Sequence, residues 1–297
     1  MVKTNPDKIV PLSISAMEII CILGQSHRIV GTSQYMKGHV ITFPLLGRLP
    51  NLGHAYTPNL EMLVALRPEL IVTWITNPGP ELENQLRPFG IDVLRLNLSR
   101  SDRLIQETKQ LAKIFDEKAQ KRALQYEAFC LKHETLIKDR IKSRKFKPTL
   151  VIEQTFKDRV AGSAAGVSIL AKILDAENYG DVFKNENAVW VDPEWVARMN
   201  PQYIVGVFAW RRNESENERL EMANKTRDGI MARPGWSDIP AVKNGHIWII
   251  DVDLAGGARY ILGLYQMAHF LYPEIVAQDE WRTVEAEYFA TFLDDIN

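Results

Sequence analysis

The sequence lacks the features that would place it in several special classes of protein. Its two cysteines, Cys21 and Cys130, lie far apart and belong to no CxxC motif or Cys/His cluster, so we expect both to be buried free thiols. Lysine and arginine, 36 in total, balance 37 aspartates and glutamates, and a net charge of −1 gives no field that would recruit nucleic acid. No apolar run approaches the length of a membrane span.

Signals of enzymes and of secretion are also missing. The segment Gly162–Ser168, GSAAGVS, lacks the lysine of a phosphate-binding loop, no GxGxxG follows a strand, and no GxSxG elbow occurs. We therefore expect no catalytic residues. The first residues, MVKTNPDK, are polar and do not form a signal peptide, which predicts either a cytosolic protein or one whose leader has been removed.

What is present is the composition of a folded protein with an ample core. The 297 residues are 46% hydrophobic and 25% charged, and a chain of this length favours two domains. In the first part of the chain, short apolar runs alternate with helical patterns, two of which begin at capping signals, Ser15–Glu18 and Thr57-Pro58. The expected strands are Lys8–Leu12, Arg28–Thr32, Glu69–Trp74 and Ile91–Leu96, and the expected helices end near Gly24, Arg67, Arg87 and Phe115. A long loop, Ser33–Tyr56, is a candidate binding loop.

Residues Asp116–Arg144 contain no glycine or proline and are rich in strong helix formers, which predicts one long helix. A weakly apolar stripe at steps of three and four residues runs along it, formed by Ala119, Ala123, Tyr126, Cys130, His133, Ile137 and Ile141. Such a helix can be a surface helix of one large domain or a spacer that joins two lobes. We take the second interpretation.

A similar order of signals occurs again beyond this helix, after an expected strand at Thr149–Glu153. A helix from Asp192-Pro193 to Asn200-Pro201 precedes the strand Tyr203–Phe208, in the order already seen before the strand Glu69–Trp74. The remaining features are a charged segment at Arg211–Arg227, an Asn244-Gly245 turn ahead of a strand, and helices at Arg259–Leu271 and Trp281–Leu293. The weak repeat predicts an α/β fold of two lobes, each a mostly parallel sheet covered by helices and joined by one long helix. The predicted boundaries are 1–115 for the N-terminal lobe, 116–145 for the connecting helix and 146–297 for the C-terminal lobe.

Several segments, taken in order, carry a resemblance to a known family. They are KIVPLSISAMEIICILG, RIVGTSQY, PNLGHAYTPNLEMLVALRPELIV, WSDIPAVKNGHIWIID and GGARYILGLYQMAHFLYPE. Together they extend over nearly the whole chain, and the set resembles the solute-binding proteins of ABC importers for iron–siderophore complexes, haem and cobalamin. The resemblance implies two lobes joined by one helix, a ligand in the cleft between the lobes, a membrane permease as partner and no chemistry on the ligand.

From this resemblance we expect an extracytoplasmic solute-binding protein that captures a metal chelate, such as a ferric siderophore or haem, or a corrinoid, and delivers it to an ABC importer. We expect a monomer, periplasmic or extracellular and either membrane-anchored or soluble, with no resident cofactor, no nucleic-acid partner, and iron or cobalt in the transported ligand. Members that bind bare zinc rely on several histidines, whereas here only His39 and His54 lie on the long loop, without HxH or HxxxH spacing. The alternative, favoured by the missing leader, is a cytosolic two-lobed enzyme or chaperone that handles a tetrapyrrole or metal, such as a chelatase.

Candidate ligand-binding residues follow the expected strands, because ligands of open α/β sheets bind at the carboxyl ends of the strands. Trp74 and Trp210 end the two repeated strands, where each can stack on a macrocycle or aromatic chelator or close the core of its lobe. Trp190 can line the same site, although a core position is the better interpretation. Other candidates at strand ends and on the long loop are Ser15, Tyr35, Tyr56, Gln154 and Arg212.

Arg259 is the best charged candidate. It follows Gly256-Gly257 at the start of an expected helix, where free amides and the helix dipole favour an anion, and it matches the Gly-x-Arg position of the family that the chain resembles. The alternative is an ordinary arginine in a surface ion pair. Asp253 suits an amide or amine of the ligand. The possible phenolate ligands to iron, which can equally be half-buried structural tyrosines, are Tyr35, Tyr56 and Tyr260.

The resemblance also implies an acidic residue on each lobe that meets arginines of the permease. Glu81 or Glu83 fits this role in the first lobe, and Glu214 or Glu216 fits it in the second. A run of charges can instead be a solvated face.

Overall fold

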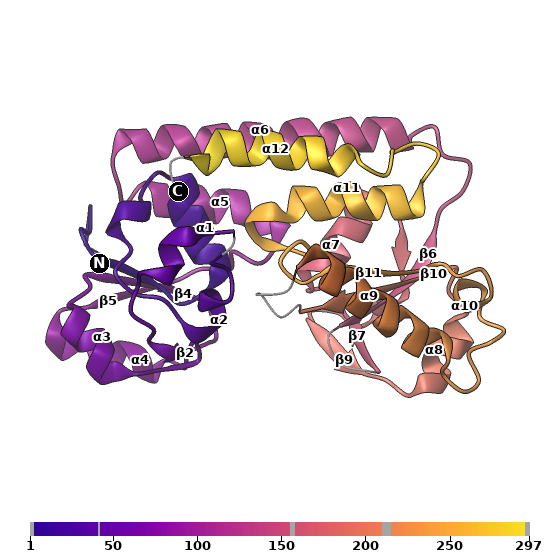
Figure 1. The fold of residues 1–297 in the computed structure, drawn as a ribbon, viewed down its shortest axis with the longest axis horizontal. Helices are drawn as coiled ribbons and strands as arrows, with labels where there is room; N and C mark the ends of the chain where they lie inside the picture. The colour runs from indigo at the N-terminus through magenta and orange to yellow at the C-terminus, as the bar shows by residue number, and fades with distance from the viewer. Residues whose placement is uncertain (1–2, 41, 155–157, 210–214, 295–297) are drawn as a thin grey trace. The chain divides into compact units, whose positions relative to one another are not determined.

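The computed structural model describes residues 3–40, 42–154, 158–209 and 215–294 (Figure 1). Contacts between Cα atoms divide the chain into two compact units. Unit 1 is formed by Met1–Phe129 with Ala286–Asn297, and unit 2 by Cys130–Glu285. Each unit contains a sheet with parallel strands and covering helices, which confirms the predicted α/β class.

The sheet of unit 1 has three parallel strands in the order β1 (Ile9–Pro11), β4 (Leu70–Thr73) and β5 (Asp92–Arg95). All three lie within predicted strands. The predicted strand Arg28–Thr32 is wrong, because the chain forms a 3-10 turn, η1 (Ser26–Arg28), and then only isolated bridges. Ile29 bridges to Ile9 and Thr32 bridges to Asn51, so this segment changes partner too soon to form a continuous strand.

Four main helices cover the sheet of unit 1. They are α1 (Ile14–Ile22), α3 (Leu60–Leu66), α4 (Glu81–Leu86) with the following turn η3 (Arg87–Phe89), and α5 (Ser101–Ala112). The buried side chains of Leu63 in α3 and Leu82 in α4 pack against Val10 and Ile71 of the sheet. The helices α1 and α5 lie on the other side of these strands (Figure 1). The predicted long loop carries two short helices and one short strand, α2 (Gln34–Lys37), η2 (Pro44–Gly47) and β2 (Gly53–His54).

Two helices of unit 1 begin at residues other than the predicted caps. The N-cap of α1 is Ser13, whose Oγ accepts a hydrogen bond from the amide of Ala16 at 3.0 Å, so Ser15 lies inside the first turn. The predicted capping box is also absent because Glu18 is buried and accepts a hydrogen bond from the hydroxyl of Tyr288 at 2.9 Å.

The N-cap of α3 is Asn59 and not Thr57. Its Oδ1 accepts a hydrogen bond from the amide of Met62 at 3.0 Å. Thr57 and Pro58 instead form a short strand, β3, which pairs with β2 in an antiparallel hairpin. Because this pairing extends the backbone through Pro58, the helix cannot begin until Leu60.

The sheet of unit 2 has six strands in the order β11-β10-β6-β7-β9, with β8 also paired to β6. The predicted parallel strands are confirmed as β6 (Thr149–Gln154), β10 (Tyr203–Phe208) and β11 (Ile247–Asp251). Three shorter strands were not predicted, namely β7 (Arg159–Ala161), β8 (Glu177–Asn178) and β9 (Ala188–Trp190). The pairs β6–β7 and β7–β9 are antiparallel, so this sheet is mixed.

The helices of unit 2 are α7 (Gly166–Ile173), α8 (Pro193–Met199), α9 (Glu216–Met231), α10 (Pro240–Lys243) and α11 (Tyr260–Leu271), with 3-10 turns η4 (Tyr179–Val182) and η5 (Gly257–Arg259). The charged segment to which the sequence assigned no element is largely α9. Ser215 and Glu218 form a capping box at its start. The repeat is seen at the ends of two helices, because Arg67 and Asn200 both adopt left-handed backbone, with φ of 48° and 50°, before a proline and a strand.

The predicted long helix is α6 (Glu117–Ile141), and all seven residues of its predicted stripe are buried. The division between the units falls inside this helix, after Phe129, and the last residues of α12 (Glu280–Phe292) belong to unit 1. These boundaries differ from those at 115 and 145 because Tyr126 and Phe129 of α6 pack against Phe292, with ring centroids 5.6 Å apart in both pairs. None of the helices in the described ranges is long and apolar enough to cross a lipid bilayer.

Candidate functional site

Two of the predicted aromatic residues meet at the carboxyl end of β4. Trp74 directly follows the strand, packs on the core of unit 1 and stays partly exposed. The ring of Tyr56 meets it edge to face, with centroids 5.2 Å apart at 80°, and His54 packs edge to face on Tyr56 at 5.2 Å and 83°. Because Tyr56 is 49% exposed, this trio presents an aromatic surface to solvent.

The β2–β3 hairpin explains why Tyr56 and His54 sit together. Gly53 has a φ of +82°, which favours glycine, and its amide donates to Oδ1 of Asn51 at 3.0 Å. The amide of Tyr56 donates to Nδ1 of His54 at 3.2 Å, which closes the loop between the two strands. The sequence GHAYTP therefore holds a tyrosine at the tip of a tight hairpin.

The other candidates of unit 1 lie on separate elements. Ser15 is half-buried in the first turn of α1. Tyr35 lies in α2, is 40% exposed and packs its ring 5.3 Å from that of the buried His39. The ring contacts beside β4 bring together Tyr56, His54 and Trp74.

In unit 2, the described candidates at strand ends are Gln154 and Trp190. Gln154 ends β6, and its amide nitrogen donates to the carbonyl of Asn187 at 3.2 Å. Trp190 ends β9 and is 66% exposed, so the core interpretation of this residue is wrong. Trp210, Arg212 and the docking candidate Glu214 lie outside the described residues.

Asp253 and Arg259 form an ion pair in unit 2. Nη2 of Arg259 lies 3.9 Å from Oδ2 of Asp253, and the two side chains are only 11% and 7% exposed, respectively. Arg259 ends the short η5 turn, and Tyr260 begins α11. The two predicted charged residues are thus brought together, but an anionic ligand would have to compete with Asp253 for the guanidinium.

The structure does not place Tyr260 where a ligand could reach it. Its side chain is fully buried, and its hydroxyl donates to Oε1 of Glu134 at 2.9 Å. Burial raises the pKa of this hydroxyl far above its usual value, and the nearby Cys130 and Glu134 raise it further. Of its two sequence interpretations, iron ligand or structural tyrosine, the structure supports the second.

A buried ion pair beside the end of β6 was missed by sequence reasoning. Nη2 of Arg233 donates to Oε1 of Glu153 at 2.8 Å, and the same oxygen accepts a hydrogen bond from the amide of Asp158 at 2.8 Å. The guanidinium also lies 4.5 Å above the ring of Trp236. The available signal was the glutamate within the apolar strand TLVIEQ, because a buried carboxylate requires a cationic or hydrogen-bonding partner.

Histidines and cysteines are dispersed. Both cysteines are buried thiols outside any disulfide, as predicted, and burial raises the pKa of the Cys21 thiol, with a further contribution from Glu18. His133 is buried on α6 and shares a hydrogen bond of 2.9 Å with the hydroxyl of Tyr265. Among the residues that the structure describes, no group of three or more His, Cys, Asp or Glu side chains is arranged to hold a metal ion.

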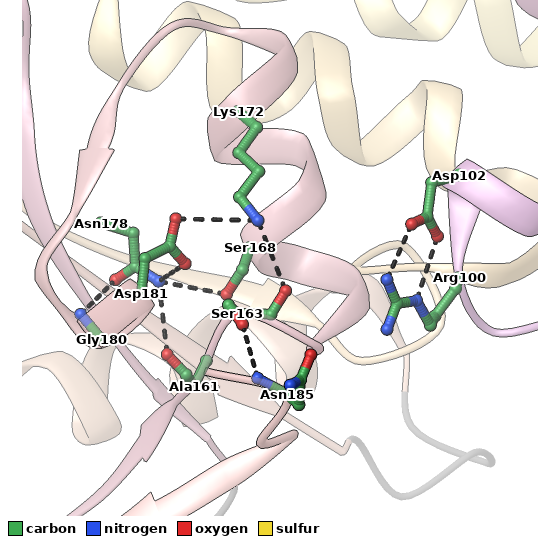
Figure 2. Close-up of polar contacts among 10 residues, drawn as sticks. All are labelled: Arg100, Asp102, Ala161, Ser163, Ser168, Lys172, Asn178, Gly180, Asp181 and Asn185. Atoms are coloured by element: carbon green, nitrogen blue, oxygen red, sulfur yellow. Dashed lines mark hydrogen bonds and ion pairs between the residues drawn. The ribbon is translucent and has the colours of Figure 1, made fainter. Parts of the chain in front are cut away.

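The segment GSAAGVS leads into α7 and is held by structural hydrogen bonds (Figure 2). Oγ of Ser163 accepts from the amide of Asn185 at 2.9 Å, and Nδ2 of Asn178 donates to Oγ of Ser168 at 3.1 Å. A Cβ at Gly162 would lie 2.4 Å from the carbonyl oxygen of Glu186, so the close packing here requires glycine. These contacts give Gly162, Ser163 and Ser168 a structural role.

A groove of about 640 Å³ lies in unit 2 beside β8 and η4. Its charged lining residues are Lys147, Lys172, Asp175, Glu177, Asp181 and Lys184. Since Glu177 pairs with Thr149, the first residue of β6, the groove is near the amino end of that strand. None of the predicted ligand-binding residues lines it, and its lysines and acids are of mixed sign.

Three of the four predicted permease-docking residues lie within the described residues, namely Glu81, Glu83 and Glu216. Glu81 is exposed in the first turn of α4, whereas both carboxylate oxygens of Glu83 accept hydrogen bonds from Arg95, at 2.6 and 2.8 Å. These hydrogen bonds hold the pKa of Glu83 below its usual value. Glu83 is therefore bonded to Arg95, whereas the side chain of Glu81 is exposed to solvent. Glu216 begins α9.

Comparison with known proteins identifies the family of this chain. The model of the family described as periplasmic binding protein matches residues 9–254 of this chain. An uncharacterised ABC transporter substrate-binding lipoprotein of Bacillus subtilis, YvrC, is 27% identical over 92% of this chain and 82% of its own. The vitamin B12-binding protein of Vibrio parahaemolyticus is 24% identical over 83% of this chain and 82% of its own.

Solved structures share the fold. The structure of Helicobacter pylori CeuE in a nickel–histidine complex superposes with a TM-score of 0.76 and 20% identity, over 99% of this chain and 92% of that one. This likeness extends over both units and matches the predicted architecture.

Proposed function

This chain belongs to the periplasmic binding protein family, and on that premise we propose that its ligand is a metal chelate, such as a ferric siderophore or haem, or a corrinoid. The protein is a solute-binding component that delivers its ligand to an ABC importer. The family match favours this function over the alternative of a cytosolic chelatase or chaperone. We propose that the ligand leaves the protein chemically unchanged.

The main structural support for this ligand class is the aromatic surface formed by Tyr56 and Trp74. Two rings at 80° to one another offer one face and one edge, which suits a large, partly flat ligand better than a small polar solute. The surface lies at the carboxyl end of β4, where ligands of α/β sheets bind. The similarity to a vitamin B12-binding protein supports the same class.

We propose that the metal of the ligand is iron or cobalt and arrives enclosed in its organic ligand, with no resident cofactor in the protein. Stacking on the aromatic surface then supplies affinity without direct coordination of the metal. The phenol of Tyr56, on the exposed tip of its hairpin, is the remaining candidate for a hydrogen bond to the chelate.

The partner is the permease of an ABC importer, and the protein acts outside the cytoplasm. We propose that it acts as a monomer, and that Glu81 of unit 1 provides a carboxylate for an arginine of the permease. Between anchored and soluble forms, the similarity to a B. subtilis lipoprotein supports the anchored form.

A titration with cyanocobalamin, haemin and a ferric catecholate chelate tests the ligand class. Trp74 is the one of seven tryptophans whose position falls in unit 1, so in protein labelled with 5-fluorotryptophan its single ¹⁹F resonance reports on this surface. We expect one of the three probes to shift this resonance. Trp74→Ala should weaken binding by about 1.5–3 kcal/mol, or roughly 10- to 100-fold.

The matched control is Trp281→Ala, which removes a partly exposed tryptophan that stacks on Arg282 at 4.7 Å and lies at no strand end. It should leave the affinity unchanged. A wild-type protein that binds a sugar or an amino acid but none of the three probes would refute the proposed ligand class.

A further inference from the structure

One arginine of unit 1 is bonded to the backbone that follows β4. Arg95 is the last residue of β5 and the register partner of Thr73, the last residue of β4. Its guanidinium nitrogens Nη1 and Nη2 donate to four backbone carbonyl oxygens of the turn 74–79. The acceptors are those of Trp74 at 3.2 Å, Ile75 at 3.3 Å, Pro78 at 2.6 Å and Gly79 at 2.9 Å.

Glu83 of α4 fixes the plane of this guanidinium. Its Oε1 accepts from Nε at 2.6 Å and its Oε2 from Nη2 at 2.8 Å, which is the paired geometry of a strong Arg–carboxylate contact. The Arg95 side chain is only 17% exposed, so water screens the contact weakly. Thr73 holds the same turn from β4, since its hydroxyl donates to the carbonyl of Asn77 at 2.8 Å.

The turn needs this support because residues 74–79 form no helix or strand of their own. Irregular backbone loses much conformational entropy when it becomes ordered, and its carbonyl groups need donors other than the regular amide ladder of a helix or sheet. Of the four carbonyls bonded to Arg95, that of Gly79 also accepts a hydrogen bond from the amide of Leu82 at 3.2 Å. Arginine is the side chain suited to the task, because its planar group carries five N–H donors in a fixed fork. A lysine at the same position has a compact ammonium group with three donors, and it cannot bond to four carbonyls and a carboxylate at once.

We infer that Arg95 is a positioning residue for ligand binding, which holds the turn 74–79 and thereby fixes Trp74 against Tyr56 before the ligand arrives. The inference rests on the proposed function, in which Trp74 contacts the ligand. Arg95 acts through the backbone of the turn and does not touch the ligand. Ordering the turn in the free protein removes an entropy cost that binding would otherwise have to meet.

The test compares wild-type full-length protein with Arg95→Gln, both labelled with 5-fluorotryptophan. In the free protein, the Trp74 resonance should shift or broaden in the variant while the other tryptophan resonances stay in place. Affinity for whichever of cyanocobalamin, haemin or the ferric catecholate chelate binds the wild type should fall about 10- to 100-fold. Arg95→Lys should restore less than half of the lost affinity on a logarithmic scale, because a lysine lacks the fork.

Arg100→Gln is the matched control. Arg100 also binds a carboxylate through Nε and Nη2, with distances of 3.0 and 2.7 Å to Asp102 (Figure 2), but this ion pair lies at the start of α5 and not at the turn 74–79. Its loss should change affinity by less than about twofold and leave the Trp74 resonance in place.

Two further measurements keep the outcomes distinct. Glu83→Gln weakens the anchor of the guanidinium but keeps all four carbonyl contacts of Arg95 available. It should therefore move the Trp74 resonance in the same direction as Arg95→Gln but by a smaller amount. If Arg95→Gln does not fold, a shift of the Trp74 resonance in Glu83→Gln relative to wild type still tests the inference. A folded Arg95→Gln protein with wild-type affinity and an unmoved Trp74 resonance would overturn the inference. If the wild type binds none of the probes, the proposed ligand class fails, and the resonance of the free protein still tests whether Arg95 positions Trp74.

Discussion

The packing of Phe292 gives a quantitative test of how the end of the chain belongs to unit 1. Its side chain is 1% exposed, and its ring lies 5.6 Å from the rings of Tyr126, Phe129 and Tyr288. The carbonyl of Phe292 also accepts a hydrogen bond from Nη2 of Arg122 at 2.8 Å. The last turn of α12 is therefore held by both side-chain and backbone contacts.

Phe292→Ala should destabilise unit 1 by about 3 kcal/mol. Replacing a buried phenylalanine by alanine typically costs about 3–5 kcal/mol through lost transfer free energy and the cavity that remains. Three aromatic contacts add to this cost, and the nearby end of the helix can relax and reduce it, so we take the lower end of the range. The equilibrium constant for unfolding should rise by roughly a hundredfold.

Urea unfolding followed by ¹⁹F NMR of fluorotryptophan-labelled protein measures this effect in each unit. The Trp74 resonance reports on unit 1, and the other six tryptophans fall within the range of unit 2. The Trp74 transition should move to lower urea by more than the others. Phe289→Ala, on the same helix but only half-buried, should have a much smaller effect.

The reasoning about this packing fails if Phe292→Ala moves the Trp74 transition no further than Phe289→Ala does. It also fails if the variant moves only the resonances of unit 2, since the last residues of α12 would then stabilise the other unit.

Two further predictions concern Tyr260 and the pH dependence of stability. Tyr260→Phe removes a hydrogen bond to the Glu134 carboxylate and should lower the free energy of unfolding of unit 2 by about 1–3 kcal/mol while ligand affinity stays the same. Urea unfolding measures the stability and ligand titration measures the affinity. Lost affinity at unchanged stability would show that Tyr260 belongs to the binding site. The pKa of Glu83 is lowered in the folded state by hydrogen bonds from Arg95, so its contribution to stability is present above the unfolded pKa of about 4.3 and is lost as the pH falls through the folded pKa. The difference in unfolding free energy between wild type and Glu83→Gln should therefore shrink between pH 6 and pH 3, and a difference that is constant across this range would contradict the assignment.

Local patterns in the sequence predicted the main parallel strands and the long helix, but not the short strands β7, β8 and β9 or the helix α9. The spacing of Ala119, Tyr126 and Ile137 predicted which face of α6 is buried, because the helical period fixes which side chains share a face. Prolines after Arg67 and Asn200 marked the ends of two helices, since the residue before a proline disfavours the α region.

The helix starts were less predictable than the ends. Ser13 and Ser15 are both good caps, and so are Thr57 and Asn59. Which residue becomes the N-cap depended on where the preceding strand or hairpin ends. Capping preferences alone do not determine that position. The isolated bridges at Ile29 and Thr32 likewise depend on partners elsewhere in the chain.

The candidate site, too, was predicted only in part from the sequence. From the sequence, the end of the strand Glu69–Trp74 predicted Trp74 as a ligand contact, and the long loop offered Tyr56 as another candidate. The sequence could not show that their rings touch, that Tyr260 is fully buried, or that Glu83 is bonded to Arg95.

By itself, then, the sequence determined the α/β class, the long helix with its buried stripe, and the family to which its ordered motifs correspond. Only the tertiary structure decided which unit holds the last residues of α12, which of two neighbouring glutamates is bonded to Arg95, and which arginine holds the turn beside Trp74. The physical reason is that periodicity and turn chemistry act between residues a few positions apart. The contacts of Arg95 with the turn 74–79 and of Tyr288 with Glu18 join residues between 16 and 270 positions apart.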